Sequence, residues 1–239
     1  MERTREALEI TLPGGPVVVL AEITPTQFLH ACKLGGSDPS AIVRGFRTTA
    51  EAMRQAVVRV DGTAKSYADL AGPGLDKAIP HARWYNALAR YFGQLHVPTE
   101  AEVAELKGAM ACTVDATGER WTVPLPGGPV VVMVEVPRET VADSLREAME
   151  SGKSESAQAF VSMISGPRRA IREVDGAAVT AADLAGEGWD ARFGVKATHL
   201  LGTAFAVIHG EGEDQGEAKP VSLGSGTASP TPPDTGTSR

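Results

Sequence analysis

The sequence predicts an α+β protein, mostly helical overall, in which two tandem copies of a small unit follow one another. Three observations support this prediction: an internal repeat, a pair of β-branched segments around a tight turn at the start of each copy, and amphipathic helical patterns after each pair. A chain of 239 residues has room for one large domain or two small ones. We therefore expect each copy to be a β-hairpin followed by three or four helices.

The internal repeat is the most informative feature of the chain. Matched blocks occur in the same order in both copies, and the segment Leu-Pro-Gly-Gly-Pro-Val-Val-Val is identical in the two. The blocks begin at Leu12 and Leu125, at Val60 and Val174, at Asp69 and Asp183, and at Leu88 and Leu201. This order predicts a first copy over residues 1–108 and a second copy over residues 109–209, each of ordinary domain size.

Each copy begins with a predicted hairpin. Residues 8–12 alternate apolar and polar side chains, a Pro-Gly-Gly-Pro turn follows, and residues 17–23 are mostly β-branched and apolar. In the second copy, residues 121–125 and 130–136 flank the same turn. A phosphate-binding loop is the alternative for such a glycine-rich turn. We favour the hairpin, because the turn lacks the Gly-Lys-Ser/Thr ending and the strand-to-helix context of those loops.

A short helix is predicted after each hairpin. Thr24 followed by Pro25 and Gln27 is a capping pattern, so the first of these helices should run to about Leu34 and stop at the next two glycines. Its counterpart in the second copy should begin at Pro137. The counterpart is expected to bury an apolar stripe of Val141, Leu145 and Met149.

A longer helix comes next in both copies. In the first copy it should begin at Asp38-Pro39, and in the second it should break or kink at Gly166-Pro167 because proline cannot donate a helical hydrogen bond. The apolar residues expected to face the core are Ile42, Phe46, Ala50, Met53 and Val57 in the first copy, and Phe160, Val161 and Ile164 in the second.

The last elements of each copy are a short capped turn and a closing helix. An Asp-Gly turn leads to Ser66 or Thr180, each followed three residues later by aspartate, a spacing typical of a helix start. The closing helix of the first copy should end before Pro98. Thr99 and Glu102 then predict a further short helix that links the copies.

Charge and composition exclude several classes of protein. The net charge of −7 comes entirely from the second copy and the last 30 residues, and only 5% of residues are aromatic, so we expect no nucleic-acid partner. No apolar run approaches the roughly 18 residues of a membrane span and no signal peptide is evident, so we expect a cytoplasmic protein without a membrane partner. Residues 210–239 are rich in Gly, Pro, Ser, Thr and acidic residues, which predicts a disordered acidic tail.

No residue pattern indicates catalysis or a cofactor. His30 and Cys32 have no second cluster at zinc-like spacing, Cys112 stands alone, and no nucleophile motif is present, so we expect no catalytic residue, no cofactor and no metal. Three aspartates recur in both copies, and turn and capping roles explain their spacing better than calcium binding does. They are Asp61, Asp69 and Asp76, with Asp175, Asp183 and Asp190 as counterparts.

Two clusters are candidates for binding a protein partner. The first is the aromatic stripe of Trp84, Tyr91 and Phe92 on the closing helix, which is core by default. Ala204 replaces the tyrosine in the second copy, and either room for a partner or simple sequence drift would explain that difference. The second is the only basic cluster, for which a solvated face or a protein interface is favoured over a nucleic-acid patch. It consists of Arg168, Arg169 and Arg172.

These motifs carry a resemblance to a known group of proteins. The helix start at Thr24-Pro25-Thr26, the Val-Asp-Gly and Asp-Leu-Ala-Gly blocks, and the closing segment from Trp84 to Glu102 resemble tail assembly chaperones and baseplate-hub assembly proteins of contractile-tailed phages and related injection systems. The second copy departs from the pattern after His209. The resemblance implies a non-enzymatic assembly factor that binds tail or baseplate proteins in the cytoplasm of the producing cell.

Two other functions stay open from the sequence. One is a structural subunit that remains in the finished baseplate or tail particle, and the other is an enzyme or ligand-binding protein with a site between the copies. Two linked copies would present two related surfaces, and linkage raises the effective concentration for the second contact. Their different charges would favour different partners.

Overall fold

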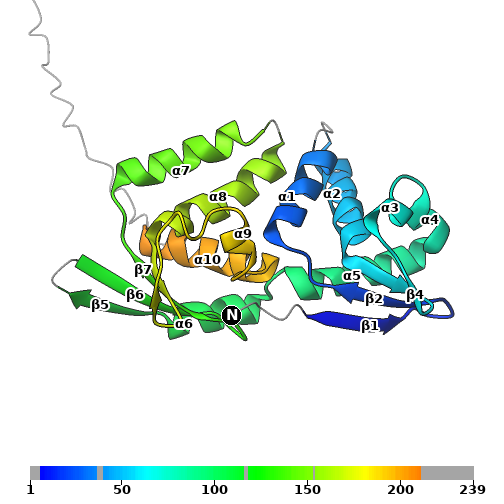
Figure 1. Ribbon diagram of the computed structural model, residues 1–239, viewed down its shortest axis with the longest axis horizontal. Helices are drawn as coiled ribbons and strands as arrows, with labels where there is room; N and C mark the ends of the chain where they lie inside the picture. The colour runs from blue at the N-terminus through cyan, green and yellow to red at the C-terminus, as the bar shows by residue number, and fades with distance from the viewer. Residues whose placement is uncertain (1–5, 37–39, 116–117, 153, 211–239) are drawn as a thin grey trace, which may run out of the picture.

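The computed structural model describes residues 6–36, 40–115, 118–152 and 154–210, and it has the α+β architecture expected from the sequence (Figure 1). Helices pack against two antiparallel sheets, one formed by the first half of the chain and one by the second. The predicted tail over residues 210–239 lies, apart from Gly210, outside the described residues.

The first sheet contains the predicted hairpin and two further strands. Its strand order is β1-β2-β3-β4, with every neighbouring pair antiparallel. The strands are β1 (Ala7–Thr11), β2 (Val17–Ala21), β3 (Val57–Val60) and β4 (Thr63–Ala64).

The prediction that Val57 ends a helical stripe was wrong. The run Val57-Val58-Arg59-Val60 is rich in β-branched residues, and it pairs with β2 as strand β3 directly after a helix. Asp61 and Gly62 then reverse the chain with positive φ angles of 46° and 75°. Positive φ at both central residues is the requirement of a tight type I′ hairpin turn.

The second sheet repeats this arrangement and adds a strand at its start. Its order is β5-β6-β7-β8-β9, and the β6–β7 pair is the predicted hairpin. The register shift between Val19 and Leu20 in β2 has a counterpart between Val132 and Met133 in β7. The strands are β5 (Ala111–Asp115), β6 (Gly118–Pro124), β7 (Val130–Val134), β8 (Ile171–Val174) and β9 (Ala177–Ala178).

The helices of the first half follow local signals closely. The Thr24 hydroxyl accepts a hydrogen bond from the Gln27 backbone N–H, and the Gln27 side-chain oxygen accepts one from the Thr24 backbone N–H, which confirms the predicted capping box of the first helix. The predicted start of the second helix at Asp38-Pro39 lies outside the described residues, and the helix begins at Ala41. The helices are α1 (Pro25–Gly35), α2 (Ala41–Ala56), α3 (Tyr67–Leu70), α4 (Gly74–Ala78) and α5 (Ala82–His96).

The helices of the second half include one that proline does not break. The helix around Gly166-Pro167 was expected to break or kink, but it continues through Pro167 to Ala170. Proline removes one backbone donor, and at this position only the final turn follows it. The elements are α6 (Glu100–Ala109), α7 (Arg138–Glu150), α8 (Glu155–Ala170), α9 (Glu187–Asp190) and α10 (Val195–Ile208).

Two predicted apolar stripes face the core only in part. On α7, Leu145 and Met149 are 51% and 72% exposed, whereas Ser144 and Ala148 are buried against α8. On α2, Ile42 and Phe46 are 86% and 58% exposed, whereas Ala50 and Met53 of the same predicted stripe are buried as expected. Both helices pack through small residues on an adjacent face, and this close packing leaves their larger apolar side chains at the surface.

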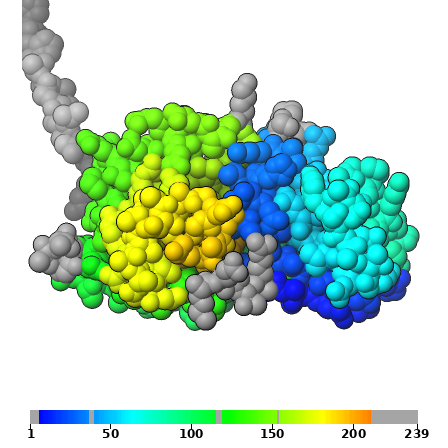
Figure 2. Space-filling model, viewed as in Figure 1, coloured from blue at the N-terminus to red at the C-terminus, as the bar shows by residue number. Residues whose placement is uncertain are grey.

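The two halves share a continuous packing surface. Phe160 and Val195 of the second half belong to the hydrophobic cluster of the first half, while Leu106 of α6 is buried in the cluster of the second half. Helix α1 lies against α8, α9 and α10, and Figure 2 shows this blue segment in contact with the yellow and orange surface of the second half. The helix expected to link the copies is therefore part of a packed core.

Candidate functional site

The aromatic residues singled out in the sequence lie on α5 and mainly support the fold. The indole Nε1 of Trp84 donates to the Pro13 carbonyl at 3.0 Å, and the ring covers Gly15, so this side chain holds the first hairpin turn against α5. Phe92 is only 5% exposed and stacks on His96 with ring centroids 4.1 Å apart. Tyr91 is half-buried beneath the guanidinium of Arg90. A partner contact by these residues stays a prediction.

The arginines of the basic cluster contact groups of the same chain. Arg168 and Arg169 both pair with Glu147 at 2.9 Å, and Arg169 also donates to the Ser144 hydroxyl. Arg172 donates to backbone carbonyls at the end of α8. These contacts tie α8 to α7, and a further role in binding a partner stays a prediction.

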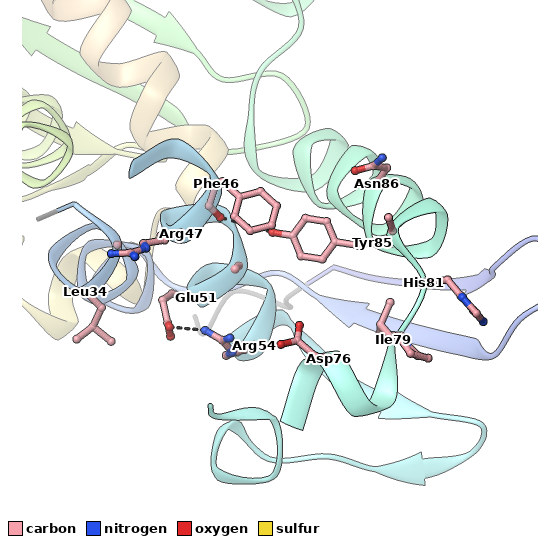
Figure 3. Close-up of a pocket in the computed structure, with 14 residues that line it drawn as sticks. Leu34, Phe46, Arg47, Glu51, Arg54, Asp76, Ile79, His81, Tyr85 and Asn86 are labelled. Carbon is pink, nitrogen blue, oxygen red and sulfur yellow. Dashed lines mark hydrogen bonds and ion pairs between the residues drawn. The ribbon is translucent and has the colours of Figure 1, made fainter. Parts of the chain in front are cut away.

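A groove that the sequence did not reveal lies on the first half. Helices α2 and α5 and the segment after α4 enclose a cavity of about 550 Å³ (Figure 3). Its apolar lining comprises Leu34, Phe46, Ala50, Ile79, Pro80, Ala82 and Tyr85, and its polar lining includes Arg47, Glu51, Arg54, Asp76, His81 and Asn86. A wall of aliphatic and aromatic side chains with polar groups at its edge is typical of a binding site.

Two aromatic rings dominate the wall of the groove. Phe46 of α2 and Tyr85 of α5 lie with their ring centroids 5.0 Å apart at an angle of 33°, and Figure 3 shows the rings directed toward each other. The Tyr85 hydroxyl lies 3.5 Å from the Phe46 carbonyl. Burial raises the pKa of Tyr85 to about 12.

The charged groups at the groove are held by neighbouring groups of the same chain. Arg54 forms an ion pair with Glu51 and donates to the carbonyls of Leu70 and Gly72, each at 3.1 Å. The Tyr67 hydroxyl donates to Glu51 at 3.1 Å. Burial, and then the adjacent Glu51 carboxylate, raise the pKa of Tyr67. This network anchors the α3–α4 segment to α2 and so fixes one edge of the groove.

The corresponding face of the second half is covered by α1. Helices α2 and α8 each follow a serine and each lead directly into a strand, so their residues can be matched in order. Phe160, the match of Phe46, packs against Phe28 of α1 with centroids 4.8 Å apart and is 2% exposed. The other matched pairs are Ala50 and Ile164, Arg54 and Arg168, Asp76 and Asp190, and Asn86 and His199.

Polar contacts fix α1 on this second face. The Thr26 backbone N–H donates to Asp190 at 3.2 Å, and the Ser154 hydroxyl donates to the Cys32 carbonyl at 2.9 Å. A Cβ on Gly36 would clash with Ser154, so glycine is required for this close approach. One half of the chain therefore holds a helix where the other half has an open groove.

The remaining candidate features in the part of the chain that the structure describes are metal ligands, reactive thiols and membrane-spanning helices. Within those residues, no group of three His, Cys, Asp or Glu side chains is placed to hold a metal ion. Cys32 is buried, and burial raises the pKa of its thiol to about 12. None of the described helices is both long and apolar enough to cross a bilayer.

Comparison of the chain with protein-family models, with curated proteins and with solved structures finds no match.

Proposed function

We propose that this protein is a non-enzymatic assembly factor that binds other proteins, and that the groove between α2 and α5 receives an apolar helix of a partner. One observation carries the proposal: a groove of about 550 Å³ is open beside Phe46 on the first half, whereas helix α1 covers the matched Phe160 of the second half and leaves a smaller cavity of about 360 Å³ there. An amphipathic helix laid into an apolar groove is a recurrent mode of protein recognition.

The sequence resemblance supports a particular class of partner. Tail or baseplate proteins of a contractile-tailed phage or a related injection system are the partners it implies, bound during tail assembly in the cytoplasm of the producing cell. In this proposal, Phe46 and Tyr85 supply the apolar contact, while the Arg54 network keeps the groove in shape for the arriving helix.

Co-purification tests the proposal. The tagged full-length chain is expressed together with the tail and baseplate proteins of its own locus, and we expect it to retain at least one of them. Phe46→Asp places a charge on the apolar wall and should reduce the recovered partner at least tenfold, because anchoring residues carry most of the binding energy. Val114→Asp alters an exposed valine on β5 and serves as the matched control.

Recovery of no tail or baseplate protein by the unmodified chain would refute the proposed partner class. Equal recovery by the Phe46→Asp variant would refute the groove as the site. Mass spectrometry of purified particles separates the two roles that the resemblance allows. An assembly factor should be absent from finished particles, whereas a structural subunit should be present in them.

A further inference from the structure

Helix α7 is the counterpart of α1 in the second half. The backbone N–H groups just before the two helices, at Ile23 and Val136, each donate to a histidine Nε2 at 3.0 Å. When the two helices are aligned on this shared contact, the buried small residues Ala31 and Gly35 of α1 correspond to Ser144 and Ala148 of α7. The same alignment matches Phe28, Cys32 and Gly36 with Val141, Leu145 and Met149.

The matched stripes of α1 and α7 differ in what covers them. The α1 stripe lies under α8, where Phe28 meets Phe160 and Cys32 accepts a hydrogen bond from Ser154. On the α7 stripe, Leu145 and Met149 are exposed. Val141 and Leu145 also border a cavity of about 90 Å³ between α7, α8 and α10. An exposed apolar stripe beside a small cavity has the form of an uncovered contact surface.

We propose that a second copy of this chain covers both open surfaces: the α7 stripe of one copy packs into the α2–α5 groove of the next. The new contact would repeat the one that α1 makes with α8 inside each copy. Phe46 would then meet Val141 and the small cavity as Phe160 meets Phe28. This inference rests on the proposed function, because it takes the groove as a helix-binding site, and it makes a second copy a competitor of the tail or baseplate partner for that site.

The charges of the two helices support this pairing. Helix α2 has Arg44, Arg47 and Arg54 against a single acidic residue, Glu51. Helix α7 has four acidic residues against Arg138 and Arg146. Helix α2 of the groove is therefore basic and helix α7 of the stripe is acidic. Opposite charges favour the association of α2 with α7, whereas two α2 helices or two α7 helices repel each other.

The proposed contact joins two different surfaces, so it is a head-to-tail contact. A pair of copies joined in this way still has one open groove, on one copy, and one open stripe, on the other. Such contacts form a ring if the rotation between copies closes, and an open chain if it does not. We therefore expect assemblies larger than a dimer at high protein concentration.

Light scattering coupled to gel filtration tests the inference on the full-length chain. We expect the mass of the unmodified protein to rise with concentration. Phe46→Asp in the groove and Leu145→Asp on the stripe should each return the protein to a monomer. Met149→Asp is a second stripe variant at a position that is 72% exposed, and Val114→Asp is the control that should leave association unchanged.

A mixture of the two variants gives the sharpest test. Phe46→Asp keeps an intact stripe and Leu145→Asp keeps an intact groove, so equal amounts of the two should form a one-to-one dimer although each alone is monomeric. A symmetric contact between two grooves or two stripes predicts something different, since one variant would then still associate with itself. Thermal unfolding of each variant verifies that it is folded.

A monomeric unmodified chain at every concentration overturns the inference, and so does association that survives both stripe variants. The two proposals fail separately. A chain that stays monomeric but still captures a tail protein through Phe46 keeps the proposed function and loses the self-association. A chain that associates through both surfaces but captures no tail protein keeps the self-association and loses the partner class.

Discussion

The buried side chain of His96 joins the segment just before helix α1 to helix α5. Its Nε2 accepts from the Ile23 backbone N–H at 3.0 Å, and its Nδ1 donates to the Phe92 carbonyl at 2.8 Å. His209 makes the same two contacts with Val136 and Phe205. The two histidines occupy corresponding positions of the internal repeat. Their acceptor role became visible only in the folded chain.

Replacing His96 should destabilise the protein strongly. His96→Ala leaves the Ile23 N–H without its acceptor and opens a cavity, so we expect a loss of about 3 kcal/mol in the free energy of unfolding. His30→Ala removes an exposed histidine on α1 and should change it by less than about 1 kcal/mol. Urea unfolding measures the free energy of unfolding of both variants. Equal losses of this free energy in the two would show that the His96 contacts contribute little to stability.

The same histidine should make stability fall in mild acid. Burial, with smaller contributions from Lys196 and His199 and against the opposing hydrogen bond to Phe92, lowers the pKa of His96 to about 4, whereas an unfolded histidine titrates near 6.5. The unfolded chain therefore binds the proton first. The stabilisation is complete above about pH 6.5 and is lost as the pH falls toward 4, by roughly 2 to 3 kcal/mol.

Protonation of carboxylates also destabilises the fold in acid. The informative quantity is therefore the difference in pH dependence between the unmodified chain and the His96→Ala variant. Urea unfolding at several pH values should show a shallower decline for His96→Ala than for the unmodified chain between pH 6.5 and 4. Parallel curves for the two proteins would rule out His96 as the source of the extra slope.

At the scale of the element, the Asp-Gly turns connect β3 to β4 and β8 to β9. Asp61 and Asp175 have positive φ angles of 46° and 50°, and each carboxylate accepts from the backbone of the neighbouring strand, at Val17 or Val130. The aspartates were assigned to turns from the sequence alone. The hydrogen bond that each carboxylate accepts from strand β2 or β7 shows why aspartate is suited to this turn.

Two glycine substitutions should act in opposite directions. Gly62 has a φ of +75°, so Gly62→Ala should lower the free energy of unfolding by about 1 kcal/mol. Gly45 is an exposed position inside α2, and a Cβ added there would meet no other atom, so Gly45→Ala should raise the free energy of unfolding by about 0.5 to 1 kcal/mol. Thermal unfolding compares the two, and a shift of the same sign in both would contradict this explanation.

At the scale of the whole molecule, one contact decides how the halves pack. Phe160 reaches from α8 into the first hydrophobic cluster, while the matched Phe46 lies at the open groove. The same residue type at matched positions therefore has two different roles. Helix α1 packs against both α2 and α8, but its Phe28 covers Phe160 on α8, whereas Phe46 on α2 lies at the open groove.

This difference predicts unequal costs for the same substitution. In dilute protein, Phe160→Ala should lower the free energy of unfolding by about 3 to 5 kcal/mol, because it empties a buried site between the halves. Phe46→Ala should lower it by about 1 kcal/mol or less, since the ring is largely exposed. Denaturant titration measures the free energy of unfolding of both variants. Similar losses in the two would mean that Phe46 is buried in solution.

Local chemistry explains which features could be predicted. The capping box at Thr24, the Pro-Gly-Gly-Pro hairpins and the Asp-Gly turns depend on residues a few positions apart, and all of them are present in the fold. The short strands β3 and β8 were missed because each directly follows a helix, and their pairing with β2 or β7 is a contact between distant residues.

The groove and the exposed stripe of α7 depended on tertiary packing. Periodicity correctly marked Phe46, Leu145 and Phe160 as apolar residues on helix faces, and it therefore predicted all three to be buried. Of the three, only Phe160 is buried, because Phe28 of α1 packs against its ring, whereas Phe46 and Leu145 are 58% and 51% exposed. A sequence pattern records that a side chain gains free energy by leaving water, but which surface removes it from water depends on segments distant along the chain.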